Sequence, residues 1–173
     1  MIEVLVTMVI IAFGLLGMAG LQVRMQASEM ESYQRSQALL LLNDMANRIA
    51  TNRTAASSYV TASAVGVDNA DCATDFSGTS LVAVDKREWC EGLKGAGETS
   101  GATKTGAMIG GRGCVEINGG DYLVTVAWQG LTPIAAPPTS VTCGAGSYNA
   151  ASGSCVLDLC RRVVTTVVRI ATL

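Results

Sequence analysis

The apolar residues of this chain are concentrated near its N-terminus. From Val4 to Val23 the sequence reads VLVTMVIIAFGLLGMAGLQV, in which only Thr7 and Gln22 are polar and no residue is charged. At ~1.5 Å per residue, a helix of this length spans the ~30 Å hydrocarbon core of a bilayer. A small domain rarely buries a helix that is apolar on every side, so the pattern predicts a helix that enters lipid or a bundle of other helices.

The pattern predicts that this helix continues as an amphipathic segment. Neither Gly nor Pro interrupts the sequence from Gln22 to Arg53. Its apolar positions recur at spacings of three and four, and most charged residues lie off the stripe that they form. We expect the stripe to pack under a globular part of the chain. It consists of Leu39, Leu42, Met45, Ala46 and Ile49.

Beyond Arg53 the pattern weakens and loops are expected to dominate. This part holds all six Cys and all three Pro, together with most of the Gly, Ser and Thr residues. A short helix is predicted from Asp85, a capping residue, to Leu93, with Trp89 on the same face as Leu93. A Gly-rich loop is expected over 92–113 and a connector over 133–142. Strands are predicted at 114–117, 122–128 and 161–170, the first two joined by the hairpin turn Asn118-Gly119-Gly120-Asp121.

The last predicted strand has one face that suits the core. Val164, Val168 and Ile170 alternate onto that face, whereas Arg169 lies on the other and is costly to bury without a partner. We therefore expect the apolar face to pack on the stripe of the long helix.

These elements predict an α+β fold with three segments. Residues 1–23 form the membrane-spanning or filament-core half of the helix, and residues 24–53 form its amphipathic half. Residues 54–173 form an extracytoplasmic globular head, in which the helix packs on a small antiparallel sheet surrounded by long loops.

Composition and charge exclude several classes of function. The chain has no His, so triads, Cys-His dyads and HExxH zinc sites are impossible. No P-loop occurs, and the GAGETSG stretch at 95–101 lacks GxGxxG spacing. We therefore expect no enzyme activity, no cofactor and no metal. The net charge of -2 also argues against nucleic acid; the candidate contacts are only Lys86, Arg87, Arg112, Arg161 and Arg162.

The six cysteines predict three disulfides and an oxidising compartment. None of them forms a CxxC pair and no His is present, which disfavours zinc. We expect a Cys72–Cys90 bridge that closes the first loop onto the short helix. The other four leave two patterns open, either Cys114–Cys143 with Cys155–Cys160, or Cys114–Cys160 with Cys143–Cys155.

The first residues, MIEVLVTMVIIAFGLLGMAGLQ, resemble the N-terminus of type IV pilins. The run Met1-Ile2-Glu3-Val4-Leu5 is similar to the family's Leu-Ile-Glu-Val-Leu pattern, and Glu3 matches the family's glutamate. Arg24 conflicts with the positive-inside rule for an exported head unless a basic leader comes first. The resemblance implies such a leader, cut by a prepilin peptidase, and two mature residues before Met1.

Within the family, three features resemble the minor pilins of the PilV type: GLLGMAGLQ, the helix around Trp89, and the pair YLVTVAWQG and RRVVTTVVRI. The resemblance implies a subunit of the inner membrane with its head in the periplasm, later part of the pilus. Its implied partners are major and minor pilins and the assembly platform.

The resemblance implies an assembly role for Glu3, which in pilins is thought to meet the N-terminal amine of a neighbouring subunit. The alternative for Glu3 is a carboxylate at the interfacial end of the helix. For the whole chain, the alternatives are a type II secretion pseudopilin, or a pilus-tip module that binds a surface or DNA.

Overall fold

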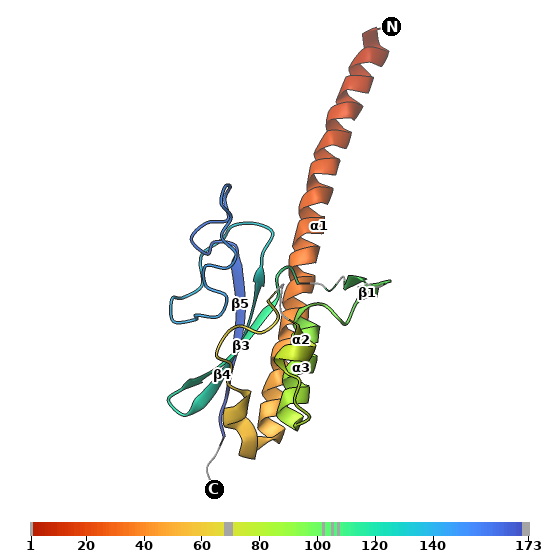
Figure 1. Ribbon diagram of the computed structural model, residues 1–173. Helices are drawn as coiled ribbons and strands as arrows, with labels where there is room; N and C mark the ends of the chain where they lie inside the picture. Colours follow the sequence, from red (N-terminus) through yellow and green to blue (C-terminus); the bar gives the residue numbers. More distant parts are fainter. Residues whose placement is uncertain (1, 68–70, 102, 105, 107, 171–173) are drawn as a thin grey trace. The chain divides into compact units, whose positions relative to one another are not determined.

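The computed structural model describes residues 2–67, 71–101, 103–104, 106 and 108–170 of the chain (Figure 1). Its long N-terminal helix α1 runs from Ile2 to Thr51. The chain divides into two compact units, Met1–Tyr33 and Gln34–Leu173, so α1 belongs to both. The first residue of the pilin-like motif, Met1, lies outside the described residues.

The first unit is the apolar part of α1. Every side chain from Ile2 to Gln26 is exposed within the chain, and this helix is long and apolar enough to cross a membrane. The hydroxyl of Thr7 donates to the carbonyl of Val4 at 2.9 Å, so this polar side chain is satisfied within the helix. The structure thus shows an unbroken apolar helical surface where the sequence predicted one.

In the second unit, α1 buries one stripe of side chains. Ala38, Leu42, Met45 and Ile49 are almost fully buried at the helical spacing of three and four. The prediction that Leu39 belongs to this stripe is wrong, because Leu39 is 39% exposed. One residue of helix turns a side chain by about 100°, which moves position 39 away from the line through Ala38 and Leu42.

The sheet is antiparallel with the order β3-β4-β5. Its strands are β3 (Arg112–Asn118), β4 (Asp121–Gln129) and β5 (Arg161–Val168). The predicted hairpin turn joins β3 to β4, with Gly119 at φ 61° and Gly120 at φ 94°. Both values lie in the left-handed region that a two-residue hairpin turn requires and that glycine adopts without strain.

The predicted inward face of β5 is confirmed. Val168 is buried, and Val164 and Ile170 pack on the same core cluster as the α1 stripe. Arg169 on the opposite face is exposed, and its Nε lies 3.0 Å from a carboxylate oxygen of Asp121. The result is a helix-on-sheet α+β head, as the sequence predicted.

Helix α3 runs from Leu81 to Leu93, so it begins earlier than predicted. Its cap is Ser80, whose hydroxyl accepts from the Ala83 amide at 3.3 Å. The prediction that Asp85 caps the helix is therefore wrong, and Asp85 is instead a buried residue of the second turn. The sequence also did not predict four short elements: the 3-10 helix η1 (Arg53–Tyr59), α2 (Cys72–Asp75), β1 (Thr99–Ser100) and β2 (Thr103–Lys104).

Three disulfides join neighbouring cysteines along the chain. The bridge from Cys72 to Cys90 ties α2 to α3, with the two Cα atoms 5.7 Å apart. The second links β3 to the loop that follows β4, and the third closes a short loop before β5. They are Cys114–Cys143 and Cys155–Cys160, with Cα–Cα distances of 5.8 and 5.2 Å.

Trp89 of α3 lies between α1 and β3. Its indole N–H donates to the carbonyl of Leu41 in α1 at 3.0 Å, and the side chain is 1% exposed. A Cβ atom at Gly113 in β3 would lie only 2.2 Å from the Trp89 ring. The absence of a side chain at Gly113 is therefore what lets the Trp89 ring approach the strand so closely.

We expect Gly113→Ala to destabilise the fold by about 1–3 kcal/mol, because the added methyl group must displace the Trp89 ring or the strand. Gly97→Ala is the matched control, since its Cβ would meet no atom within 4 Å. Thermal unfolding of the full chain in detergent measures both. A Gly113→Ala chain as stable as the control would contradict the packing of Trp89.

Peptide mapping of the unreduced protein tests the disulfide pattern. We expect linked peptides for Cys72–Cys90, Cys114–Cys143 and Cys155–Cys160, and no reactive thiol after denaturation, because the pairs have their Cα atoms at bonding distance. Recovery of Cys114–Cys160 or Cys143–Cys155 peptides, or of stoichiometric zinc, would overturn this arrangement.

Candidate functional site

Glu3, the candidate assembly residue, lies in the first turn of α1 with its side chain exposed within the chain. A carboxylate at this end of a helix is favoured by the helix dipole. An assembly role and a carboxylate at the interfacial helix end both place Glu3 in this first turn, so its position does not distinguish them. The assembly role stays a prediction.

The second unit contains a cluster of charged and polar side chains from three elements, which the local sequence did not indicate. We call Arg48, Asp44, Asp85, Glu88 and Tyr59 the Arg48 cluster. The guanidinium of Arg48 reaches Asp44 at 2.9 Å, Asp85 at 2.6 Å and Glu88 at 2.7 Å. Only the Asp44–Arg48 pair, four residues apart on one helix, has a spacing that local sequence reveals.

Tyr59 connects η1 to the same cluster. Its hydroxyl donates to a carboxylate oxygen of the buried Asp85 and accepts from the side-chain amide of Asn52 at 3.2 Å. One carboxylate on α3 thus receives hydrogen bonds from Arg48 of α1 and from Tyr59 of η1. These bonds satisfy a charge that would otherwise be costly to bury.

The environment shifts the pKa of two groups in the cluster. Burial alone would lower the pKa of Arg48, but its bonds to Glu88, Asp44 and Asp85 outweigh that effect and raise it. Burial and the hydrogen bond to Asp85 both raise the pKa of Tyr59. Both shifts stabilise the protonated forms, so the cluster holds a fixed cation and a neutral phenol instead of a group poised for proton transfer.

The candidate nucleic-acid contacts are engaged within the fold. Arg161 is buried and donates to the carbonyls of Val141 and Cys143, at 2.8 and 3.0 Å, and Arg162 donates to that of Thr132 at 2.6 Å. The other three make similar bonds: Lys86 to Val60 at 3.1 Å, Arg87 to Phe76 at 3.2 Å, and Arg112 to the Ser147 hydroxyl at 2.8 Å. Each of these hydrogen bonds ties a cation to another segment of the second unit, and nucleic-acid binding itself stays untested.

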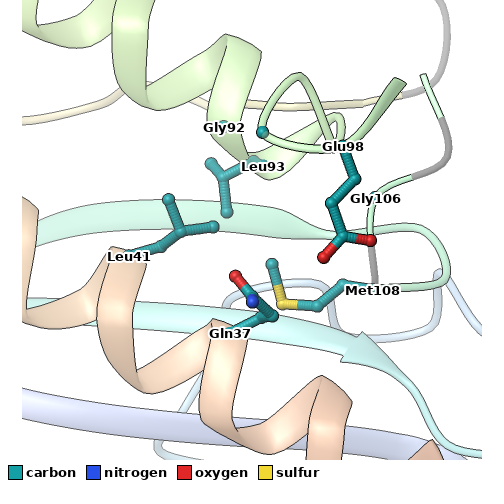
Figure 2. A pocket seen from close by; sticks show the side chains of 9 residues that line it. Gln37, Leu41, Gly92, Leu93, Glu98, Gly106 and Met108 are labelled. Atoms are coloured by element: carbon teal, nitrogen blue, oxygen red, sulfur yellow. The ribbon is translucent and has the colours of Figure 1, made fainter. Parts of the chain in front are cut away.

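Two hollows of the second unit can be described from the residues that line them. Figure 2 shows one at the C-terminal end of α3, where the side chains of Leu41, Leu93 and Met108 converge. Its volume of about 90 Å³ is far below the ~300–1,000 Å³ of typical ligand pockets. A larger hollow of about 450 Å³ lies beside Lys86 and Phe76. Among the described residues, no group of three or more His, Cys, Asp or Glu side chains is placed to hold a metal ion.

We expect unfolding experiments at alkaline pH to report on Tyr59. Because the folded state raises the pKa of this phenol above its ordinary value of 10.0, the unfolded chain loses that proton first. Stability should then be complete below about pH 10 and fall as the pH rises further. Tyr59→Phe should remove this loss of stability at alkaline pH, whereas Tyr33→Phe, at an exposed tyrosine, should keep it. Identical pH profiles for the wild type and Tyr59→Phe would contradict the Tyr59–Asp85 bond.

Comparison with known protein families finds a match. Residues 20–87 match the family model described as "Tt1218-like: Type IV pilin Tt1218". The matched part is less than half of the chain; it includes the end of the apolar helix, the buried stripe of α1, η1, α2 and the first half of α3. Type IV pilins are structural proteins, so the match supports a structural class and not an enzyme. No curated protein and no solved structure matches the chain.

Proposed function

We propose that this chain is a minor pilin of the PilV type, which takes part in assembling type IV pili as a member of the priming or tip complex. The match to the pilin family model over residues 20–87 carries the proposal. It is supported by the helix-on-sheet fold and by an apolar helix in the position where pilins have one.

The apolar part of α1 gives the proposal its physical basis. Its large apolar side chains are half to four-fifths exposed within the chain, including Ile2 at 80% and Phe13 at 70%. Water is a poor solvent for a surface of this extent, so the helix requires lipid or other apolar helices around it. A pilin encounters both environments, the inner membrane before assembly and the packed helices of the filament afterwards.

The disulfides fit the location that this function requires. The thiol–disulfide balance of the cytoplasm disfavours such bonds, whereas the periplasm and the cell exterior favour them. We infer that the second unit lies in the periplasm while the apolar part of α1 is in the membrane, and outside the cell once the subunit is in a pilus. The proposed partners are other minor and major pilins, the inner-membrane assembly platform, and a prepilin peptidase acting on the precursor.

Glu3 is the residue proposed to set the position of this subunit among its neighbours. A charged carboxylate in the bilayer core costs at least ~2.5 kcal/mol on insertion scales. The cost falls when a neighbouring subunit supplies a cation. In a bundle of apolar helices few other groups distinguish one axial position from the next, so this pairing favours a single register.

Glu3→Ala in the full-length precursor should lower co-purification with partner pilins, because the subunit loses its proposed charge pair in the helix bundle. The thermal unfolding of the second unit should not change. Glu29→Ala, which removes an exposed carboxylate further along α1, is the matched control.

Co-purification that is unaffected by Glu3→Ala would contradict the assembly role of this residue. Co-purification with a type II secretion complex instead of pilins would favour the pseudopilin alternative. Retention of the full chain on DNA, unchanged by the Glu3 substitution, would favour the binding module.

A further inference from the structure

The loops between β4 and β5 expose apolar side chains in a stretch of sequence without charge. Residues 130–157 contain no Asp, Glu, Lys or Arg, whereas charged residues recur throughout 68–129. The amide of Ile134 donates to the Leu159 carbonyl at 2.8 Å, so the segment after β4 lies beside the segment before β5. The large apolar side chains that are exposed in this stretch form what we call the loop patch: Leu131, Ile134, Val156 and Leu157.

The most exposed member of the loop patch lies on a strained turn. Leu157 is 81% exposed, and its φ of 52° lies in the left-handed region, as does that of Asp158 at 61°. A bulky residue such as leucine rarely adopts this conformation, because its Cβ approaches the following carbonyl oxygen too closely. Such a backbone persists only where the surrounding structure holds it, and positions of this kind concentrate at functional sites.

The surrounding structure holds this turn from several sides. The Cys155–Cys160 disulfide closes the loop. The amide of Asp158 donates to the side-chain oxygen of Asn149 at 2.8 Å, and its carboxylate accepts from the amide of Gly146 at 2.8 Å. The loop is thus fixed in a shape that turns a leucine outward, although water is a poor environment for an apolar side chain.

The loop patch lies at the end of the second unit where α1 enters it. Gln37, in the first turn of α1 within this unit, lines one hollow together with Met108. The carbonyl of the next residue, Ile109, accepts a hydrogen bond of 2.9 Å from the amide of Gln129, where β4 ends. The loops that follow β4 extend beyond this end of the sheet, whereas the turn of the β3–β4 hairpin lies at the opposite end (Figure 1).

We propose that the loop patch is a lipid-contacting surface, which enters the headgroup region of the membrane that the apolar part of α1 spans. The inference rests on the membrane location proposed above for α1, and it adds a second point of contact with lipid. Residues 24–33 join the end of the apolar run to the second unit, so the end that carries the patch is the one tied to the membrane.

The chemistry of the patch favours lipid as its partner. Apolar side chains gain free energy when they leave water for the boundary between headgroups and acyl chains. A charge brought to the same depth would oppose this transfer, and residues 130–157 carry none. A protein partner needs a surface that matches the shape of the patch, whereas lipid tails adapt to a side chain that protrudes singly, as Leu157 does.

Fluorescence quenching by lipid-borne nitroxides tests the contact in the full chain, reconstituted in vesicles of phosphatidylethanolamine and phosphatidylglycerol. A single introduced cysteine carries the fluorophore, because the six native cysteines are bonded in pairs. We expect quenching to be several-fold stronger for Ile134→Cys than for Ile117→Cys. The two isoleucines are equally exposed, at 54%, but Ile117 lies next to the hairpin turn at the other end of the sheet.

A second substitution separates lipid contact from folding. Leu157→Gly, added to Ile134→Cys, should lower the quenching at position 134, because the patch loses its most exposed side chain. The same change should leave the melting temperature unchanged or raise it, since glycine adopts a φ of 52° without strain. Val167→Ala, which shortens an exposed apolar side chain near the end of β5, is the control and should leave the quenching unchanged.

Phe13→Cys, within the apolar run, reports separately on α1. Strong quenching at position 13 with equal quenching at positions 134 and 117 would overturn the lipid contact and leave the membrane location of α1 intact. Absence of quenching at position 13 would overturn both. The lipid contact is also overturned if position 134 is shielded from a water-soluble quencher but not reached by the lipid nitroxides, since a protein partner would then cover the patch.

Discussion

One side of α1 supports the second unit of this chain. Ala38, Leu42, Met45 and Ile49 are almost completely shielded from water, and the other layers pack against them. Complete burial of a large aliphatic side chain contributes about 1.5–3 kcal/mol, so three such residues on one stripe supply much of the driving force for docking a helix on a sheet. Because the second unit depends on α1 in this way, residues 34–51 cannot be separated from the head without loss of its core.

Two polar attachments fix the position of α3 on α1. The indole of Trp89 binds the Leu41 carbonyl within the apolar layer, and Arg48 binds Asp85 and Glu88 near the end of α1. Apolar contacts alone would let α3 slide along α1. A hydrogen bond to one particular carbonyl and carboxylates bound by one particular arginine prevent that sliding. Tyr59 joins this network through Asp85, so the chain that leaves α1 is tied down at the same place.

Local sequence could predict the elements whose periodicity determines them. The long helix, the hairpin with its Gly119-Gly120 turn and the inward face of β5 followed from spacing and from β-branched residues. Asp85 was misassigned because an acid that caps a helix and an acid that binds a distant arginine have the same local sequence. Its partner Arg48 is 37 positions away. The short elements η1 and α2 lie in Ala-, Ser- and Thr-rich sequence without periodicity, so no local signal indicated them.

The candidate functional residues also differ in how far local sequence could indicate them. Glu3 was singled out because a carboxylate so early in an apolar helix is unusual and because the first residues resemble the pilin motif, and its assembly role stays a prediction. The Arg48 cluster depends on which distant segments meet, and only the folded chain shows that. The disulfides lie between these two cases. The number of cysteines indicated three bridges, but their spacing left the pairing of four cysteines open.

We propose that the apolar part of α1 assembles with pilins, and the most direct test is quantitative mass spectrometry of sheared filaments. Cells that express the full-length precursor should release filaments containing peptides of the second unit, in smaller amounts than the major pilin. Deleting the gene should reduce the number of filaments. The account would be contradicted if the protein remained entirely in the membrane fraction and the deletion strain formed filaments in normal number.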